Sequence, residues 1–346
     1  MDHEALCYDF IFDKRGAFME IINKANSFVG KNLTYIVIIT VIMAFIKPQT
    51  FAWAAPHTVA LLSIIMFGMG MTLTANNFKS IFSQPRQVLV GCMLHYTIMP
   101  LIAYALTIIF RLPAELAVGM ILLGSCPSGT ASNVMSYLAK GDVPLAVCIT
   151  SVSTLLAPIL TPMLTWAMAG QWITVSFTAM LLSVVKMIIA PIILGLLFHR
   201  IVGHTVVIKF SKILVLLSAF SVLTIVGSLV ALNGSQLIEV GLILVLIVLI
   251  HNLCGFAIAY VLTGVLDLGL PQRHTVTLEV GMQNDALACS LATIHFTPTV
   301  AIPGVIGAVV HQMTGSMLAT IFASLMDKKK ESVHESLSIT TAPSQQ

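Results

Sequence analysis

The sequence predicts an all-α membrane protein with ten transmembrane helices. Of its 346 residues, 58% are hydrophobic and only 9% are charged, whereas about 25% of the residues of a typical soluble domain are charged. The apolar residues form runs of roughly 15 to 25 residues between short polar segments, and about 20 apolar residues cross the hydrocarbon core of a bilayer as a helix. The alternation of apolar and polar residues that a transmembrane β-barrel needs is absent from the sequence.

Ten apolar runs follow one another along the chain, and the loops between them are short. We expect the ten spans at 34–47, 57–74, 88–110, 116–139, 143–168, 174–198, 210–232, 237–264, 274–295 and 300–325. Each of these runs is apolar enough to be predicted as a membrane-spanning helix. Because the number of spans is even, we expect the two termini on the same side of the membrane.

The basic residues divide unevenly between the two sides of this arrangement. Fourteen of the 17 Lys and Arg residues lie on the side of the termini, Lys47 and Arg111 lie on the other side, and Lys186 lies inside a span. Cytoplasmic loops of membrane proteins carry an excess of basic residues. Both termini are therefore expected in the cytoplasm.

The ends of the chain differ in composition from the part between them. Residues 1–32 are expected to be a cytoplasmic N-terminal segment without a secretory signal peptide. Residues 33–326 hold the ten spans. Residues 327–346 end in a Ser-, Thr- and Gln-rich stretch and are expected to be a disordered cytoplasmic tail.

Two spans contain residues that interrupt a helix. The fourth includes Gly124-Ser-Cys-Pro-Ser-Gly-Thr-Ala-Ser-Asn133, and the ninth includes Glu279-Val-Gly-Met-Gln-Asn-Asp285. Pro127 removes a backbone donor, and glycine adopts backbone conformations that other residues resist. Each break falls in the fourth span of a five-span half, and five spans is an odd number. Two such halves would have opposite orientations, which is the inverted-repeat plan in which interrupted helices mark the binding site.

Glu279 and Asp285 are carboxylates that we place inside the ninth span, where an unpaired charge costs at least about 2.5 to 3.5 kcal/mol. One interpretation is that each is protonated or paired with Lys186 or a histidine. The other is a bound cation, because Ser132, Asn133, Thr150 and Gln283 offer oxygen atoms nearby. Hydroxyl, carbonyl and single carboxylate oxygens suit sodium, since a divalent ion usually recruits more negative charge.

Each broken helix also restarts with free backbone amides, near Ser132 and near Asn284. A helix start attracts anions, so an organic anion is expected there, with Thr130 and Asn284 as hydrogen-bond donors. An ionised Asp285 would repel that anion. It must therefore face away, be protonated, or indicate a different substrate.

Other polar residues and motifs give weaker signals. His95 in the third span could be a packing residue or a proton relay. The six cysteines show no metal-binding spacing. The sequence contains no nucleotide-binding, metalloprotease or serine-hydrolase motif, so we expect no enzymatic activity.

Three stretches, 129–135, 150–155 and 279–284, resemble the signatures of the bile acid:sodium symporter family, especially its bacterial members. The resemblance implies a core domain of helices 3–5 and 8–10, a panel domain of helices 1, 2, 6 and 7, and a crossing of the unwound helices 4 and 9. It also implies symport of sodium and an organic anion, a bile acid or a small carboxylate such as pantoate, by alternating access. The protein would work as a monomer in the bacterial inner membrane, with no nucleic-acid partner.

The same resemblance implies two sodium sites and a substrate site. The first ion would be held by Ser132, Asn133, Thr150 and Glu279, and the second by Glu279, the carbonyls of Val280 and Met282, and Gln283, with His95 as a further candidate. The substrate would contact Gly129, Thr130, Asn284, Asp285 and Gln312. The chain departs from the family pattern in having Ala146 where members can offer a serine, Asp285 in place of the usual serine, and Gln312 where asparagine is common.

Two alternatives to this function stay open at the level of the sequence. A proton-coupled carrier could use His95, Glu279 and Asp285. A membrane sensor could bind the same ligand without moving it, although the chain has no soluble signalling domain.

Overall fold

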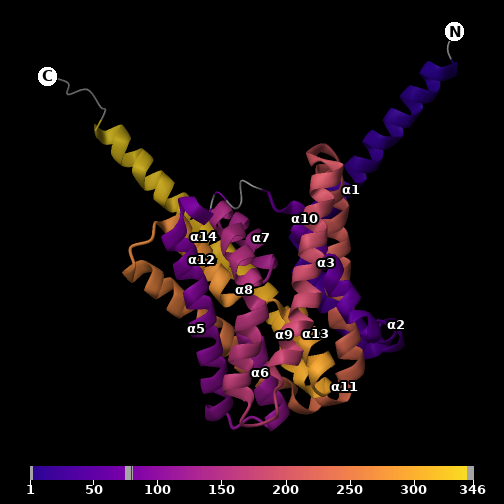
Figure 1. Cartoon of the computed structure of the whole chain (residues 1–346). Helices are drawn as coiled ribbons and strands as arrows, with labels where there is room; N and C mark the ends of the chain where they lie inside the picture. Colours follow the sequence, from indigo (N-terminus) through magenta and orange to yellow (C-terminus); the bar gives the residue numbers. More distant parts are fainter. Residues whose placement is uncertain (1–2, 75–78, 80, 341–346) are drawn as a thin grey trace.

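The computed structural model describes residues 3–74, 79 and 81–340, and within these residues it is helical and contains no β-strand. This confirms the all-α prediction. The helices form one bundle, and both ends of the chain leave it on the same side (Figure 1).

The helices occur in the same order as the predicted spans. They are α1 (His3–Ile46), α2 (Gln49–Ala52), η1 (Ala55–His57), α3 (Thr58–Thr72), α5 (Pro85–Ile109), α6 (Ala114–Ser125), α7 (Ala131–Leu138), α8 (Val143–Ala169), α9 (Phe177–Val184), η2 (Val185–Ile189), α10 (Ala190–Val202), α11 (His204–Val265), α12 (Leu270–Gly281), α13 (Asp285–His295), η3 (Pro298–Ala301) and α14 (Ile302–Thr340). The short element η2 is a π-helix that carries Lys186 in the middle of the sixth predicted span.

Seven helices in the described part of the chain are long and apolar enough to cross a membrane, so the protein is a multi-pass membrane protein. An eighth is added if the two parts of α1, Glu20–Gly30 and Asn32–Ile46, count as one span, although they are bent by 75°. The predicted spans 116–139 and 274–295 are not among these eight. Each of them is divided into two short helices, α6 with α7 and α12 with α13.

Two boundaries differ from the prediction. The seventh and eighth predicted spans both lie in α11, as the candidate spans Val206–Glu239 and Gly241–Val265. The last helix, α14, runs past 325 into the predicted tail as far as Thr340, where Lys and Glu residues favour helix. Residues 341–346 of that tail, and residues 1–2 of the N-terminal segment, lie outside the described residues.

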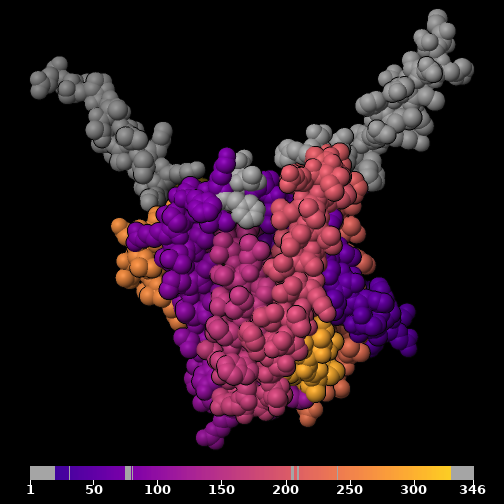
Figure 2. Space-filling view, viewed as in Figure 1, coloured from indigo at the N-terminus to yellow at the C-terminus, as the bar shows by residue number. Residues whose placement is uncertain are grey.

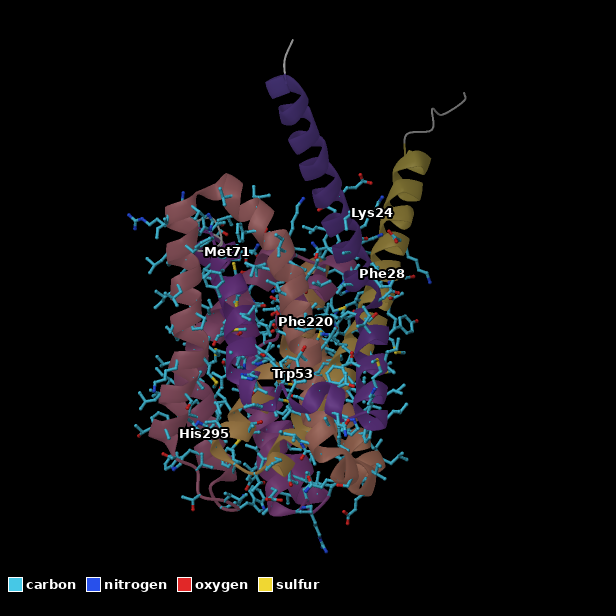
Figure 3. The ribbon with its side chains drawn as sticks, turned by 90° about the vertical axis from the view of Figure 1, so that its right-hand side faces the viewer. Lys24, Phe28, Trp53, Met71, Phe220 and His295 are labelled. Carbon is cyan, nitrogen blue, oxygen red and sulfur yellow. The ribbon has the colours of Figure 1, made fainter. Side chains whose placement is uncertain are left out.

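Helices α3 and α10 approach each other at two glycines. A Cβ atom on Gly70 would lie 2.2 Å from the carbonyl oxygen of Ile192, and one on Gly195 would lie 2.4 Å from that of Phe67. The contact is near the end of α3 that carries Met71 (Figure 3). Small residues allow membrane helices to pack backbone against backbone.

The outer surface of the bundle is apolar. Helix α8 exposes Ile159 and Trp166, and α9 and α10 expose Leu182 and Leu194, each by at least half of its surface. Figure 2 shows one face of the bundle, with α8 and α9 in magenta to pink. Large apolar side chains exposed over several helices match a surface covered by lipid.

Candidate functional site

The two predicted breaks lie against each other inside the bundle. The Gly129 amide, between α6 and α7, donates a 3.0 Å hydrogen bond to the Met282 carbonyl, between α12 and α13. In return, the Asn284 amide donates to the Pro127 carbonyl over 2.8 Å. Each break therefore satisfies backbone groups that the other leaves without an intrahelical partner, as buried backbone at membrane depth requires.

Glycine is needed where the breaks touch. A Cβ atom on Gly129 would lie 2.5 Å from the carbonyl oxygen of Gln283, and one on Gly281 would lie 2.2 Å from the ring of Phe256. The Gly281 carbonyl accepts a 2.7 Å hydrogen bond from the Asn252 side chain of α11. The missing side chain at Gly129 thus permits the close approach of the two breaks, and the one at Gly281 permits the second break to pack against Phe256 of α11.

Glu279 on α12 is fully buried and is surrounded by hydroxyl groups. Its Oε1 atom lies 2.5 Å from the Ser132 hydroxyl of α7. Its Oε2 atom lies 2.6 Å from the Ser128 hydroxyl, in the break, and 2.7 Å from the Thr150 hydroxyl of α8. Hydrogen bonds to a carboxylate are stronger than those between neutral groups, so these three donors offset part of the cost of burying it.

The predicted first sodium set is brought together by these contacts. The Asn133 side-chain oxygen lies 3.2 Å from the Thr150 hydroxyl, which also contacts Glu279. The Thr150 hydroxyl oxygen also lies 3.0 Å from the carbonyl oxygen of Ala146, the position without a serine hydroxyl. The cluster offers one carboxylate and several neutral oxygens, which is the mixture that suits a hard monovalent cation.

The residues of the predicted second set follow Glu279 along the chain. The Val280 carbonyl accepts a 3.1 Å hydrogen bond from the Gln283 side-chain amide, and the Met282 carbonyl accepts the bond from Gly129. In the described part of the protein, the side-chain oxygen of Gln283 is buried without a hydrogen-bond partner. A buried acceptor without a donor is costly, and a cation would satisfy it.

His95 on α5 lies beside these residues but does not contact the carboxylate. Its Nδ1 atom lies 3.0 Å from the backbone carbonyl oxygen of Glu279, and its Nε2 atom lies 2.8 Å from that of Cys126. It bridges the α12 backbone and the first break. His251 is likewise used in packing, since its Nε2 atom lies 3.0 Å from the carbonyl oxygen of Met99.

The predicted substrate residues Thr130, Asn284 and Asp285 lie at the starts of the two short helices. Thr130 is the N-cap of α7 and makes no side-chain capping bond. The Asn284 side chain caps α13 by accepting from the Leu287 amide over 3.1 Å. The Oδ1 atom of Asp285 lies 2.9 Å from Nδ1 of His311 on α14.

Gln312 follows His311 on α14 and is buried. Its side-chain oxygen has no hydrogen-bond partner within the described residues.

Sequence reasoning missed two residues of the site, Ser128 and His311. Ser128 belongs to the same polar motif as Ser132, and its hydroxyl in that motif was the one available signal, since it lies in the break, where helical spacing does not apply.

The chain resembles known membrane transporters over most of its length. The model of the sodium bile acid symporter family matches residues 59–240. An uncharacterised sodium-dependent transporter of Bacillus subtilis, YocS, is 40% identical over 312 residues, which cover 90% of this chain and 97% of the relative. The probable sodium/metabolite cotransporter BASS1 of Arabidopsis thaliana is 33% identical over 93% of this chain and 81% of its own length. The human sodium/bile acid cotransporter 4 is 31% identical over 69% of this chain and 56% of its own length.

Proposed function

The chain belongs to the sodium bile acid symporter family, and from this premise we propose that it couples sodium entry to the uptake of a small organic anion. The relatives are named as transporters or cotransporters, and the protein is a transporter rather than an enzyme. The observation that carries the proposal is the buried carboxylate of Glu279, which lies among three hydroxyl groups where the two helix breaks meet.

The proposed architecture has ten spans. The eight candidate spans, with the bent α1 counted as one, become ten when the broken pairs α6 with α7 and α12 with α13 are each taken as a span. Two halves of five spans then have opposite orientations, with a broken helix in the fourth place of each. The panel would contain α1, α2–α3, α9–α10 and the first part of α11, and the core would contain the other helices.

The proposed ion sites share Glu279. Ser128, Ser132, Asn133 and Thr150 would hold the first sodium ion with it, and Gln283 and the carbonyls of Val280 and Met282 would hold the second. Sodium supplies the positive charge that a buried carboxylate otherwise lacks. Because the hydroxyls come from the first break and α8 and the carboxylate from α12, sodium would also fix these elements relative to one another.

The substrate is proposed to bind at the crossing of the breaks. A carboxylate group at the start of α7, beside Gly129 and Thr130, would meet free amides and the positive end of the helix dipole. The part of the substrate remote from this carboxylate group would contact Asn284, Asp285 and Gln312. Bile acids and small carboxylates such as pantoate are the candidate substrates, because two relatives are named as metabolite or bile acid cotransporters.

Transport is proposed to follow alternating access in a monomer of the bacterial inner membrane, with both termini in the cytoplasm. Two sodium ions carried with one monoanion move one net positive charge inward. Moving one charge through 100 mV releases about 2.3 kcal/mol. The membrane potential would therefore add to the sodium gradient in concentrating the substrate.

The test is the thermal stability of the purified protein against sodium concentration at constant ionic strength, with potassium as the other cation. Sodium should raise the unfolding temperature of the wild type, and the rise should vanish in Glu279→Gln. Glu239→Gln makes the same chemical change at an exposed position of α11 and should behave like the wild type. Equal curves in sodium and potassium for the wild type would reject sodium coupling and favour a proton-coupled carrier.

A further inference from the structure

The starts of α7 and α13 are adjacent, but they offer opposite chemistry. The first turn of α7 has no acidic residue, and its N-cap Thr130 makes no side-chain capping bond. The first turn of α13 is capped by the Asn284 side chain and carries the carboxylate of Asp285. An incoming anion is therefore favoured at the start of α7 and disfavoured at the start of α13.

Asp285 differs from its neighbours in accessibility. From His274 to Ala292 every residue is buried except Asp285. In the other broken span, residues 116–129 are all buried, and Thr130 is the first residue that is not. The two breaks are thus accessible at Thr130, the N-cap of α7, and at Asp285, the first residue of α13.

The Asp285 side chain is held against α14. Its Oδ1 atom lies 2.9 Å from Nδ1 of His311, whose side chain is only 1% exposed. A Cβ atom on Gly307 would lie 2.6 Å from the same carboxylate oxygen, so glycine at 307 leaves the space that the carboxylate fills. Among the described residues, His311 is the ion-pairing partner of Asp285, and no Lys or Arg side chain lies within 4.0 Å of it.

Polar atoms of this pair lack hydrogen bonds. In the described part of the chain, Nε2 of His311 is buried without a partner, and the Asp285–His311 contact, although short, lacks the alignment of a hydrogen bond. A buried polar group without a partner costs free energy. The pair can therefore gain stability from a further hydrogen-bond partner, such as a ligand. The exposed part of the Asp285 side chain, 13% of its surface, can accept a hydrogen bond from a ligand.

We propose that the Asp285–His311 pair selects carboxylates that also carry a hydrogen-bond donor, an ammonium or hydroxyl group, at the end remote from the carboxylate. The inference rests on the proposed symport and adds the substrate class. The substrate carboxylate binds at the start of α7, and its donor group meets Asp285 at the start of α13. A site built to pair with a polar group rejects an analogue that lacks it, because the site's own groups then stay unpaired. A simple fatty carboxylate is accordingly a poor ligand.

The experiment compares three probes of similar size in sodium buffer: β-alanine, 3-hydroxypropionate and butanoate. Their dissociation constants are measured by calorimetry on the purified wild type, Asp285→Ser and Asp285→Asn. The wild type should bind β-alanine or 3-hydroxypropionate at least about tenfold more tightly than butanoate, and Asp285→Ser should reduce that ratio to about twofold. The isosteric Asp285→Asn keeps an acceptor oxygen without the charge, so it should lose preference for β-alanine more than for 3-hydroxypropionate.

Several results would overturn the proposal. They are a wild type that prefers butanoate, a wild type that binds none of the three probes, and substituted proteins that keep the wild-type ratios. If Asp285→Ser does not fold, Asp285→Asn alone decides. The sodium titration of the wild type without probes is run beside these measurements. A normal sodium response with no donor preference refutes only the substrate class, whereas an absent sodium response refutes the proposed function itself.

Discussion

The two helix breaks supply different parts of one site. The break between α6 and α7 contributes hydroxyl groups and no charge, whereas α12 and α13 carry the two carboxylates, the buried Glu279 and the partly exposed Asp285. These two acids are six residues apart, yet Glu279 has three hydroxyl neighbours and Asp285 has one histidine. The comparison teaches that neither break forms the proposed ion site alone, because the carboxylate of Glu279 comes from one side and the Ser128 and Ser132 hydroxyls come from the other.

The largest effect is expected from a change that separates the breaks. In Gly129→Ala, the new methyl group would lie 2.5 Å from the Gln283 carbonyl oxygen, so the backbones must move apart. Forcing an extra methyl group into packed structure costs about 1 to 3 kcal/mol. We expect a lower unfolding temperature and loss of the sodium-dependent rise. Gly30→Ala is the matched control, since nothing lies within 4 Å of a Cβ atom there. A Gly129→Ala protein with a normal sodium response would show that close contact of the breaks is dispensable.

A smaller effect on the sodium response, weaker binding rather than loss, is expected from removing one hydroxyl beside Glu279. Thr150→Val keeps the shape of the side chain but removes the hydroxyl that lies 2.7 Å from Glu279. A lost hydrogen bond to a charged group costs about 1.5 to 3 kcal/mol. The sodium concentration at half-maximal stabilisation should therefore rise by roughly tenfold or more. Thr320→Val removes an exposed hydroxyl of α14 and should leave that concentration unchanged. Equal values for the two variants would exclude Thr150 from ion binding.

The smallest effect concerns the caps of the two restarts. Asn284→Ala removes the side chain that caps α13, and loss of an N-cap costs about 1 kcal/mol. Thr130→Ala removes the N-cap side chain of α7, which makes no capping bond, and should cost less. Denaturant unfolding without sodium or substrate measures both changes. Equal destabilisation would contradict the asymmetry between the two helix starts.

Much of the fold could be predicted from hydropathy and helix-breaking residues. The all-α class followed from the length of the apolar runs, and both breaks were expected where Pro127, Gly129 and Gly281 occur. The continuation of α11 through two predicted spans was not foreseen, because the polar residues around Gln236 resemble a loop. The π-helix at Lys186 also has no sequence signal that hydropathy can detect.

The site was predictable in its residue types but not in its contacts. Glu279 was identified because a carboxylate in a span needs compensation. Ser128 was overlooked, since the direction of a hydroxyl in a broken helix depends on the segment that crosses it, and that segment lies about 150 residues away in the chain. Asp285 and His311 are much closer together in the sequence. Their contact was nevertheless not predicted, because the sequence does not show which acidic residue a histidine will contact.

The glycine contact between α3 and α10 has a mechanical consequence. Backbone atoms touch there with no layer of side chains between them, so the two helices have little freedom to slide past each other by a turn. The two helices should therefore move together as one rigid body. Any rearrangement that opens the protein to one side of the bilayer and closes it to the other must then change backbone dihedral angles at hinges elsewhere in the chain.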